Sequence, residues 1–339
     1  MKLRIFEEYL KPWAAKVGSP RQVHRIWVVD GFAGQGKYDD GTLGSPMLAL
    51  ECARAIALAG KDYTLGCVFV EKEPAHARAL EALAKDYPAV DVSVIAGDFW
   101  AVTEQVAGIV RGDPYLLMID PYGIKDLDLA KLAKLAKASS RCDLVVTFVE
   151  SAVPRLETQY KEAIAQAIGE RDPSERSAAE TFSRNMAVAG RFLPGGRYAI
   201  KQNFDAAKSY ELIVFSRSAH AYELWNDFMT KETAKLKQGK WLRTNAVTSR
   251  LPEFEEAFGE AEAVDEPQEA SVQIMDWARA SSGLRFTREQ MIHHFVVNCF
   301  TCHHTSTWKT ALSHLEGSGE VRRLHVGKPI DKDKWEITR

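Results

Sequence analysis

Hydrophobic and polar positions in the first 150 residues follow two alternating periods. Apolar side chains recur at helical spacing in five segments, 3–17, 45–58, 74–86, 100–111 and 127–138. Short apolar runs of strand length alternate with these segments at 25–30, 65–71, 90–96, 115–120 and 143–149. Because strands that alternate with helices form a parallel sheet covered on both faces, the pattern predicts a doubly wound, Rossmann-like α/β domain.

The pattern changes after residue 150. Residues 153–192 have helical spacing and are rich in arginine, which predicts a helical insertion with either a solvated face or a positive cap over a cleft. Strand-like runs at 197–203 and 210–216 are joined by a short link, so we expect them to pair antiparallel, followed by a helix at about 219–236. A mostly parallel sheet with an antiparallel last strand is typical of methyltransferases, so residues 1–250 are predicted to form a methyltransferase-like Rossmann domain.

The last 90 residues predict a linker and a small second domain. Residues 251–270 hold eight acidic side chains and no lysine or arginine, as a solvated linker does. Three helical patterns follow, near 271–281, 287–297 and 305–316, and then two strand-like runs at 320–326 and 334–338. This order predicts a winged-helix-like domain over 271–339, with Thr305 or Ser306 capping its third helix. Winged helices contact nucleic acid or protein, and both alternatives stay open.

Composition and charge say more about the cellular location of the protein than about its binding partners. A formal net charge of -2 over 339 residues gives no global argument for nucleic acid or membrane. No apolar run approaches the roughly 18 to 20 residues that span a bilayer, and charged residues interrupt the start of the chain where a secretory signal would be apolar. The five cysteines are an odd number, which favours reduced thiols. We therefore expect a cytoplasmic protein without membrane partners.

Acidic and glycine residues gather where the predicted strands end, which is where a doubly wound sheet binds its ligand. The first strand ends in Asp30 and enters a Gly-rich turn at 31–36, followed by a polar loop at 37–43 and by Ser45-Pro46 as the expected N-cap and first helical residue. Glu71 ends the second strand and Asp98 follows the third. The predicted cofactor-binding residues are Asp30, Phe32, Ala33, Gly34, Gly36, Glu71, Asp98 and Phe99.

These strand ends predict a bound nucleoside, S-adenosylmethionine. Gly34 and Gly36 would lie under its methionine part, and Glu71 would accept both ribose hydroxyls. Asp98 would accept from the adenine amine, and Phe99 would cover the ring. Each feature alone also has an ordinary structural reading as a tight turn, a surface charge or a helix cap. A dinucleotide fingerprint would need glycine or alanine at position 39, which is Asp39, and no Gly-Lys-Ser/Thr follows the turn as a P-loop requires.

The fourth strand ends in Asp120-Pro121-Tyr122-Gly123, which resembles the catalytic motif of amino-methyltransferases. In that motif a carboxylate and the following backbone carbonyl bind an exocyclic amine of a nucleic-acid base, and an aromatic ring stacks on the flipped base. Asp120, Pro121 and Tyr122 are therefore the predicted catalytic residues. The second proline of the usual signature is absent, and the variant is closer to transfer-RNA guanine dimethyltransferases. The alternative is a turn with Tyr122 packed in the core.

Several of these motifs together resemble the three-Cys-motif partner protein family. The resemblance rests on residues 28–34, on Gly44-Ser45-Pro46, on 69–72 and on 119–123 with Lys125, and it extends through about residue 235. It implies a methyltransferase-like fold and a partner protein with a three-Cys, radical-SAM-like motif. It also implies an alternative function, a non-catalytic cofactor-binding or docking protein for that partner. Gln35 replaces a proline that is common in the family.

Cys299 and Cys302 raise the question of a metal. The run Cys299-Phe300-Thr301-Cys302-His303 matches the haem attachment pattern, but that chemistry needs export. Zinc is a second alternative because histidines lie nearby, yet the spacing lacks two well-separated ligand pairs. The sequence therefore predicts no metal site and favours a pair of partly buried thiols.

Overall fold

The computed structural model describes twelve segments of the chain, residues 2–38, 41–149, 161–170, 177–193, 196–201, 209–231, 267–280, 285–287, 290–291, 294–295, 303–325 and 334–338. The chain divides into two compact units, Met1–Ala221 and Tyr222–Arg339. The division precedes the predicted boundary at residue 250. Its physical basis is that Asn226 and Asp227 hydrogen-bond to residues 303 and 305, at the start of a helix of the second unit.

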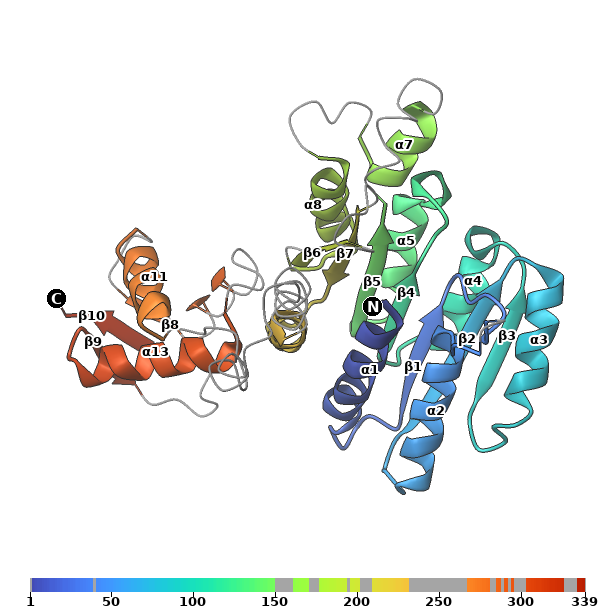
Figure 1. Ribbon diagram of the computed structural model, residues 1–339, viewed down its shortest axis with the longest axis horizontal. Helices are drawn as coiled ribbons and strands as arrows, with labels where there is room; N and C mark the ends of the chain where they lie inside the picture. Colours follow the sequence, from blue (N-terminus) through green and yellow to red (C-terminus); the bar gives the residue numbers. More distant parts are fainter. Residues whose placement is uncertain are drawn as a thin grey trace, which may run out of the picture. The chain divides into compact units, whose positions relative to one another are not determined.

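The first unit is built on a seven-stranded sheet (Figure 1). Its strands are β1 (Arg25–Asp30), β2 (Thr64–Glu71), β3 (Val92–Ala96), β4 (Tyr115–Ile119), β5 (Cys142–Phe148), β6 (Gly196–Lys201) and β7 (Ser209–Phe215). They lie in the order β3-β2-β1-β4-β5-β7-β6. The first five strands are parallel, and β7 runs antiparallel to both β5 and β6. The predicted doubly wound sheet and its antiparallel last strand are confirmed.

Helices cover both faces of this sheet. They are α1 (Lys2–Gly18), α2 (Ser45–Leu58), α3 (Pro74–Ala84), α4 (Phe99–Val110), α5 (Leu129–Ala136), α7 (Lys161–Ile168) and α8 (Ala178–Gly190), with a short 3-10 turn, η1, at Ile124–Asp126. Right-handed crossovers place α2 and α3 on one face, with α1 packed on α2, and α4, α5 and α8 on the other. The central strands are buried on both sides, which is why they read as continuous apolar runs.

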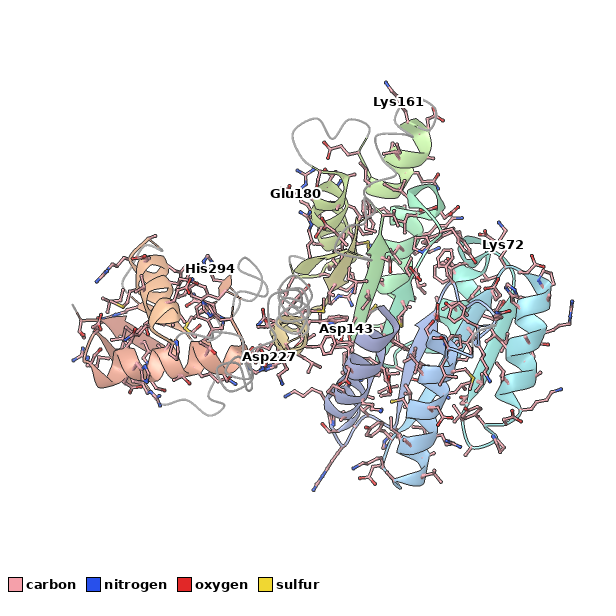
Figure 2. All side chains as sticks on the ribbon, viewed as in Figure 1. Lys72, Asp143, Lys161, Glu180, Asp227 and His294 are labelled. Atoms are coloured by element: carbon pink, nitrogen blue, oxygen red, sulfur yellow. The ribbon has the colours of Figure 1, made fainter. Side chains whose placement is uncertain are left out.

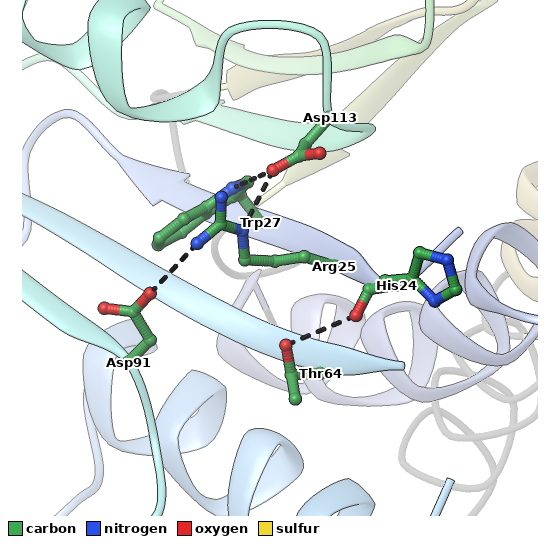
Figure 3. Close-up of polar contacts among 6 residues, drawn as sticks. All are labelled: His24, Arg25, Trp27, Thr64, Asp91 and Asp113. Atoms are coloured by element: carbon green, nitrogen blue, oxygen red, sulfur yellow. Dashed lines mark hydrogen bonds and ion pairs between the residues drawn. The ribbon is translucent and has the colours of Figure 1, made fainter. Parts of the chain in front are cut away.

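At the amino ends of the strands, one polar cluster ties three connections together (Figure 3). Asp113, just before β4, accepts from Arg25 Nε at 3.0 Å and from Trp27 Nε1 at 3.1 Å. The same guanidinium reaches Asp91 before β3 at 3.6 Å and lies over the Trp27 ring. This cluster stabilises the amino edge of the sheet.

A second polar contact holds α1 against the sheet. Asp143, which Figure 2 labels, lies in β5. It accepts from Trp13 Nε1 at 2.7 Å and from the Ser216 hydroxyl at 2.5 Å. Arg217 donates to backbone carbonyls that include those of Ala136 and Gly190, so it satisfies the ends of α5 and α8. Burial raises the pKa of Asp143, while the hydrogen bonds from Ser216 and Trp13 and the charge of Arg217 act in the opposite direction.

The second unit contains α11 (Pro267–Ala280), β8 (Arg285–Thr287), α13 (Thr305–Gly317), β9 (Val321–His325) and β10 (Lys334–Ile337). Its three strands form an antiparallel sheet in the order β8-β10-β9, and residues 290–291 and 294–295 are helical. The predicted linker at 251–270 is wrong in its last four residues, because Pro267 begins α11, a favourable position for proline in the first helical turn. Residues 251–266 lie outside the described residues.

The start of α13 differs from the sequence prediction. Its N-cap is His304, whose Nδ1 accepts from the Ser306 N–H, so the predicted cap at Thr305 or Ser306 is wrong. Asp227 Oδ1 accepts from the Thr305 N–H at 2.6 Å. A buried helix end needs acceptors for its free N–H groups. Here the His304 ring and the carboxylate of Asp227, which is 78 residues away in sequence, supply them. Trp308 is 1% exposed and stacks on Phe295.

We predict that Asp143 makes stability depend on pH. When the folded-state pKa of an acid lies above the unfolded-state value, the native protein binds more protons between the two values, so stability falls as pH rises from about 4 through the raised pKa. The Asp143→Asn variant cannot ionise and should lack this slope. Thermal unfolding followed by circular dichroism from acid to neutral pH measures it. A difference in Tm between the two proteins that does not change with pH would contradict the prediction.

Candidate functional site

The turn after β1 is organised by the buried carboxylate of Asp30, which is 2% exposed. Asp30 Oδ1 accepts from the Phe32 N–H at 3.1 Å, and Oδ2 accepts from the Ser45 hydroxyl at 2.6 Å. The predicted role of Ser45 as N-cap is therefore wrong, because Gly44 occupies the N-cap and Ser45 is the first residue of α2. Asp30 thus joins the Gly-rich turn to α2 from inside the fold.

Glycine is required in this turn for different reasons at different positions. Gly34 and Gly36 have positive φ angles, 67° and 79°. A Cβ atom at Gly34 would meet no described atom within 4 Å, whereas one at Gly36 would approach Leu80 Cδ2 at 2.9 Å. Gly44 closes the loop that follows by donating to the Gly36 carbonyl at 2.8 Å. The backbone of the turn at Gly34 is therefore open to close approach.

Glu71 connects the end of β2 to the same turn. It is 6% exposed, and its Oε2 accepts from the Gly34 N–H at 2.7 Å. Oε1 accepts from the Glu73 N–H at 2.8 Å and lies 3.9 Å from His76 Nδ1. The Ala33 N–H donates to the Val70 carbonyl at 3.0 Å. Each carboxylate oxygen of Glu71 keeps acceptor capacity beyond these backbone donors.

Asp98 and Phe99 follow β3 and begin α4. Asp98 is the N-cap, accepting from the Trp100 N–H at 3.0 Å, and Lys72 Nζ lies 3.5 Å from its second oxygen. Phe99 is 3% exposed and packs 5.9 Å from the Phe32 ring, centroid to centroid. This placement differs from the expectation of an open ring face, because Phe99 supports the turn from the core and Phe32 lies nearer the surface.

The Asp120-Pro121-Tyr122 segment follows β4, next to the turn after β1. Pro121 is buried, Asp120 is half-buried and Tyr122 is 89% exposed, so the alternative in which Tyr122 packs in the core is wrong. Although the ring is mostly exposed, desolvation of the phenol by neighbouring atoms, and then the negative charges of Glu71 and Asp120, hold the pKa of Tyr122 above its ordinary value. The phenol therefore stays protonated at neutral pH and can donate a hydrogen bond.

Tyr38 belongs to this edge although the sequence predicted only a polar loop there. The loop is a small hairpin, in which Lys37 and Leu43 form an antiparallel bridge and the Tyr38 N–H donates to the Thr42 carbonyl at 2.9 Å. Tyr38 is 53% exposed, and Leu43 is also exposed. The sequence signal for this turn was Gly41, a glycine placed between Tyr38 and Leu43. In the structure Gly41 has a φ of 83°, which glycine adopts readily.

The four acidic strand ends meet at one edge of the sheet. Asp98, Glu71, Asp30 and Asp120 lie at the carboxyl ends of β3, β2, β1 and β4, which are successive neighbours. Asp30 is used within the turn, while the other three can accept from hydroxyl or amine donors of a ligand. Within the described residues, no group of three or more potential ligands could hold a metal ion. The arrangement fits an uncharged or cationic ligand with several donors and a flat ring.

In the second unit, His294 and His303 contact aromatic rings. His294 stacks on Trp277, and His303 is buried edge-on against Trp308. Cys299 and Cys302 lie outside the described residues, so the prediction about metal there stays a prediction. No helix among the described residues is both long and apolar enough to cross a bilayer.

The chain matches no family model and no curated protein. Among solved structures it is similar to protein LPL1258 from Legionella pneumophila, with 13% identity, 63% of this chain and 84% of that chain covered, and a TM-score of 0.43. M. jannaschii TYW2 in complex with AdoMet gives 14% identity, coverages of 62% and 74%, and a TM-score of 0.34. Trm1 from Pyrococcus horikoshii with S-adenosyl-L-methionine gives 10% identity, covers 67% of this chain and 58% of that chain, and has a TM-score of 0.36.

Likenesses of this strength assign neither a family nor a substrate to this chain. None of the three names the three-Cys-motif partner family, so that resemblance stays a prediction.

We predict that Gly44→Ala destabilises the protein by about 1–3 kcal/mol. Its Cβ would lie 2.9 Å from the Gly36 carbonyl oxygen, a backbone atom held by the turn. Gly108→Ala is the matched control, because Gly108 is exposed inside α4 with no described atom within 4 Å of a Cβ. This control should be stabilised by about 1 kcal/mol. Urea unfolding of both variants measures the difference, and equal effects would refute the packing argument.

Proposed function

We propose that the first unit binds S-adenosylmethionine and transfers a methyl group to an exocyclic amine of a nucleic-acid base. The observation that supports this most is the common edge at which Asp98, Glu71 and Asp120 lie around the Gly-rich turn, with Tyr122 exposed beside Asp120. The strand order, with β7 antiparallel, is the arrangement expected of a methyltransferase sheet and not of a dehydrogenase sheet.

The cofactor would lie across the ends of β1, β2 and β3. Gly34 and Gly36 would pass under its methionine part, where the open backbone at Gly34 permits close approach. Glu71 would accept from the ribose hydroxyls and Asp98 from the adenine amine, with Phe32 and Ala33 lining the turn. When bound, the cofactor supplies an electrophilic methyl group. The remaining chemistry belongs to the protein, which must present a nitrogen lone pair to that group.

Asp120 would hold the amine of the substrate. One amine N–H donates to its carboxylate and the other to the backbone carbonyl that follows, so the nitrogen lone pair is directed toward the methyl group. The nitrogen must lose a proton when it is methylated, and the Asp120 carboxylate would accept it. Tyr122 would stack on the flipped base, and the exposed ring of Tyr38 offers a second surface at the same edge.

We further propose that the second unit is a winged helix. The order of its described helices and strands supports this assignment. Arg322 is paired with Glu336, which also pairs with Arg285, and Arg323 is paired with Glu316. These ion pairs give the arginines a structural role between the strands and α13, and contact with nucleic acid or with protein stays open for this unit.

We predict that S-adenosylmethionine binds the wild-type protein and that Glu71→Gln weakens this binding. A hydrogen bond to a charged group contributes about 1.5–3 kcal/mol, or about 10- to 150-fold in affinity. Calorimetry with S-adenosylmethionine and S-adenosylhomocysteine measures this. Glu71 also binds the Gly34 and Glu73 N–H groups, so thermal unfolding of the variant must accompany the titration. Absence of heat with the wild type would contradict the proposed function.

We predict that Asp120→Ala lowers turnover by about 10²-fold or more while cofactor affinity stays nearly unchanged, since the carboxylate positions the substrate nitrogen. Tyr122→Ala should instead weaken substrate binding by about 1–3 kcal/mol, and Tyr122→Phe should retain most of it because stacking needs only the ring. Steady-state kinetics with labelled cofactor separate the two effects. Wild-type turnover in Asp120→Ala would assign that residue to turn geometry alone, and cofactor binding without any transfer would favour the docking alternative.

A further inference from the structure

A basic groove lies between α4 and α5 on one face of the first unit. It has a volume of about 140 Å³ and is lined by the cations Arg111, Lys131, Lys134 and Lys137 and by one acid, Glu104. All four cations are exposed. The whole chain has a formal charge of -2, so this local excess of positive charge runs against the overall balance.

Helix dipoles account for only part of this cluster. Lys134 lies in the last turn of α5, and Lys137 and Arg111 are the C-caps of α5 and α4, all positions that favour a cation. Lys131 lies in the first turn of α5, where the dipole disfavours a cation. Its Nζ donates to the Trp100 carbonyl at 3.1 Å, which holds the charge at the mouth of the groove.

Acidic neighbours do not neutralise the groove. Glu104 Oε1 lies 2.5 Å from Lys134 Nζ and compensates that lysine. Within the part of the chain that the structure describes, neither Arg111 nor Lys137 has a carboxylate within ion-pair distance. At least three positive charges therefore remain for an anion, and the rise of about 1.5 Å per helical residue spreads Lys131 and Lys137 over about 9 Å.

Hydrogen bonds link Lys131, which lines the groove, to the loop of the candidate site. Trp100 follows Asp98 and Phe99, and its Nε1 donates to the Asp126 carbonyl at 2.6 Å. Asp126 ends η1, the short turn that follows Tyr122. The loop that presents Tyr122 and the residue that anchors Lys131 are thus hydrogen-bonded to each other. From that point α4 and α5 extend toward the opposite edge of the sheet.

We propose that this groove binds the phosphate backbone of the nucleic-acid strand whose base is methylated at Asp120. The inference rests on the proposed function for the identity of the strand. A strand carries one charge per about 3.4 Å of duplex axis, so a groove that is positive over about 9 Å spans more than one phosphate. The backbone would run from Lys131, beside the site, toward Arg111 and Lys137.

The test compares two double variants of the full-length protein. Arg111→Gln with Lys137→Gln removes two groove charges, and the glutamine side chains keep helix propensity. The matched control is Lys16→Gln with Lys85→Gln, two cations at the carboxyl ends of α1 and α3. The probe is a fluorescein-labelled, single-stranded RNA 20-mer of mixed sequence, titrated between 50 and 200 mM salt, with cofactor affinity measured in parallel by calorimetry.

The groove variant should bind the RNA about 60-fold more weakly at 50 mM salt and about tenfold more weakly at 200 mM salt, if the loss is that of two counterion-releasing contacts. Its slope of log affinity against log salt should be flatter by about 1.4, because each neutralised phosphate on a single strand contributes about 0.7. The control should match the wild type, and both variants should bind cofactor normally. An unchanged slope in the groove variant, or an equal loss in the control, overturns the groove proposal. Cofactor binding and methyl transfer are read separately, so a wild type that binds RNA but transfers no methyl group overturns the proposed function alone.

Discussion

Two buried carboxylates hold the Gly-rich turn in place, and the site depends on that turn. A buried charge is unfavourable unless hydrogen-bond donors surround it, and Asp30 and Glu71 each obtain donors from backbone N–H groups of the turn or its neighbours. Asp30 also accepts from the Ser45 hydroxyl, so the turn is joined to α2 as well as to β2. The ends of three elements are thereby fixed around one stretch of open backbone.

The parallel direction of the strands brings the remaining site residues together. Because β3, β2, β1 and β4 are adjacent and run the same way, residues that are distant in sequence, such as Asp98 and Asp120, reach the same edge. The cluster of Arg25, Trp27, Asp91 and Asp113 stabilises the opposite edge. One edge is thus stabilised by ion pairs, while the other presents carboxylates and two exposed tyrosines. We therefore propose that the ligand binds at the carboxyl ends of the strands, where doubly wound sheets bind their ligands.

The sequence predicted the sheet well because burial on both faces leaves a strong apolar signal. The strand predicted at 25–30 coincides with β1, and the hairpin of β6 and β7 follows from two apolar runs with a short link. Side-chain roles were harder to predict, since they depend on contacts between distant segments. Ser45 looked like a cap but donates to Asp30, and His304 caps α13 with help from Asp227. Tyr38 was overlooked because its exposure at the site depends on how the 37–43 hairpin folds.

The most direct test asks whether the edge around Asp120 methylates a base amine, as we propose. The direct measurement is to incubate the purified protein with RNA and S-adenosylmethionine carrying a deuterated methyl group, digest the RNA, and analyse the nucleosides by mass spectrometry. We predict a nucleoside that carries the heavy methyl group on an exocyclic nitrogen and is missing with Asp120→Ala. Heavy label confined to a ribose or a carbon atom, or found on no nucleoside while the cofactor binds, would contradict the account.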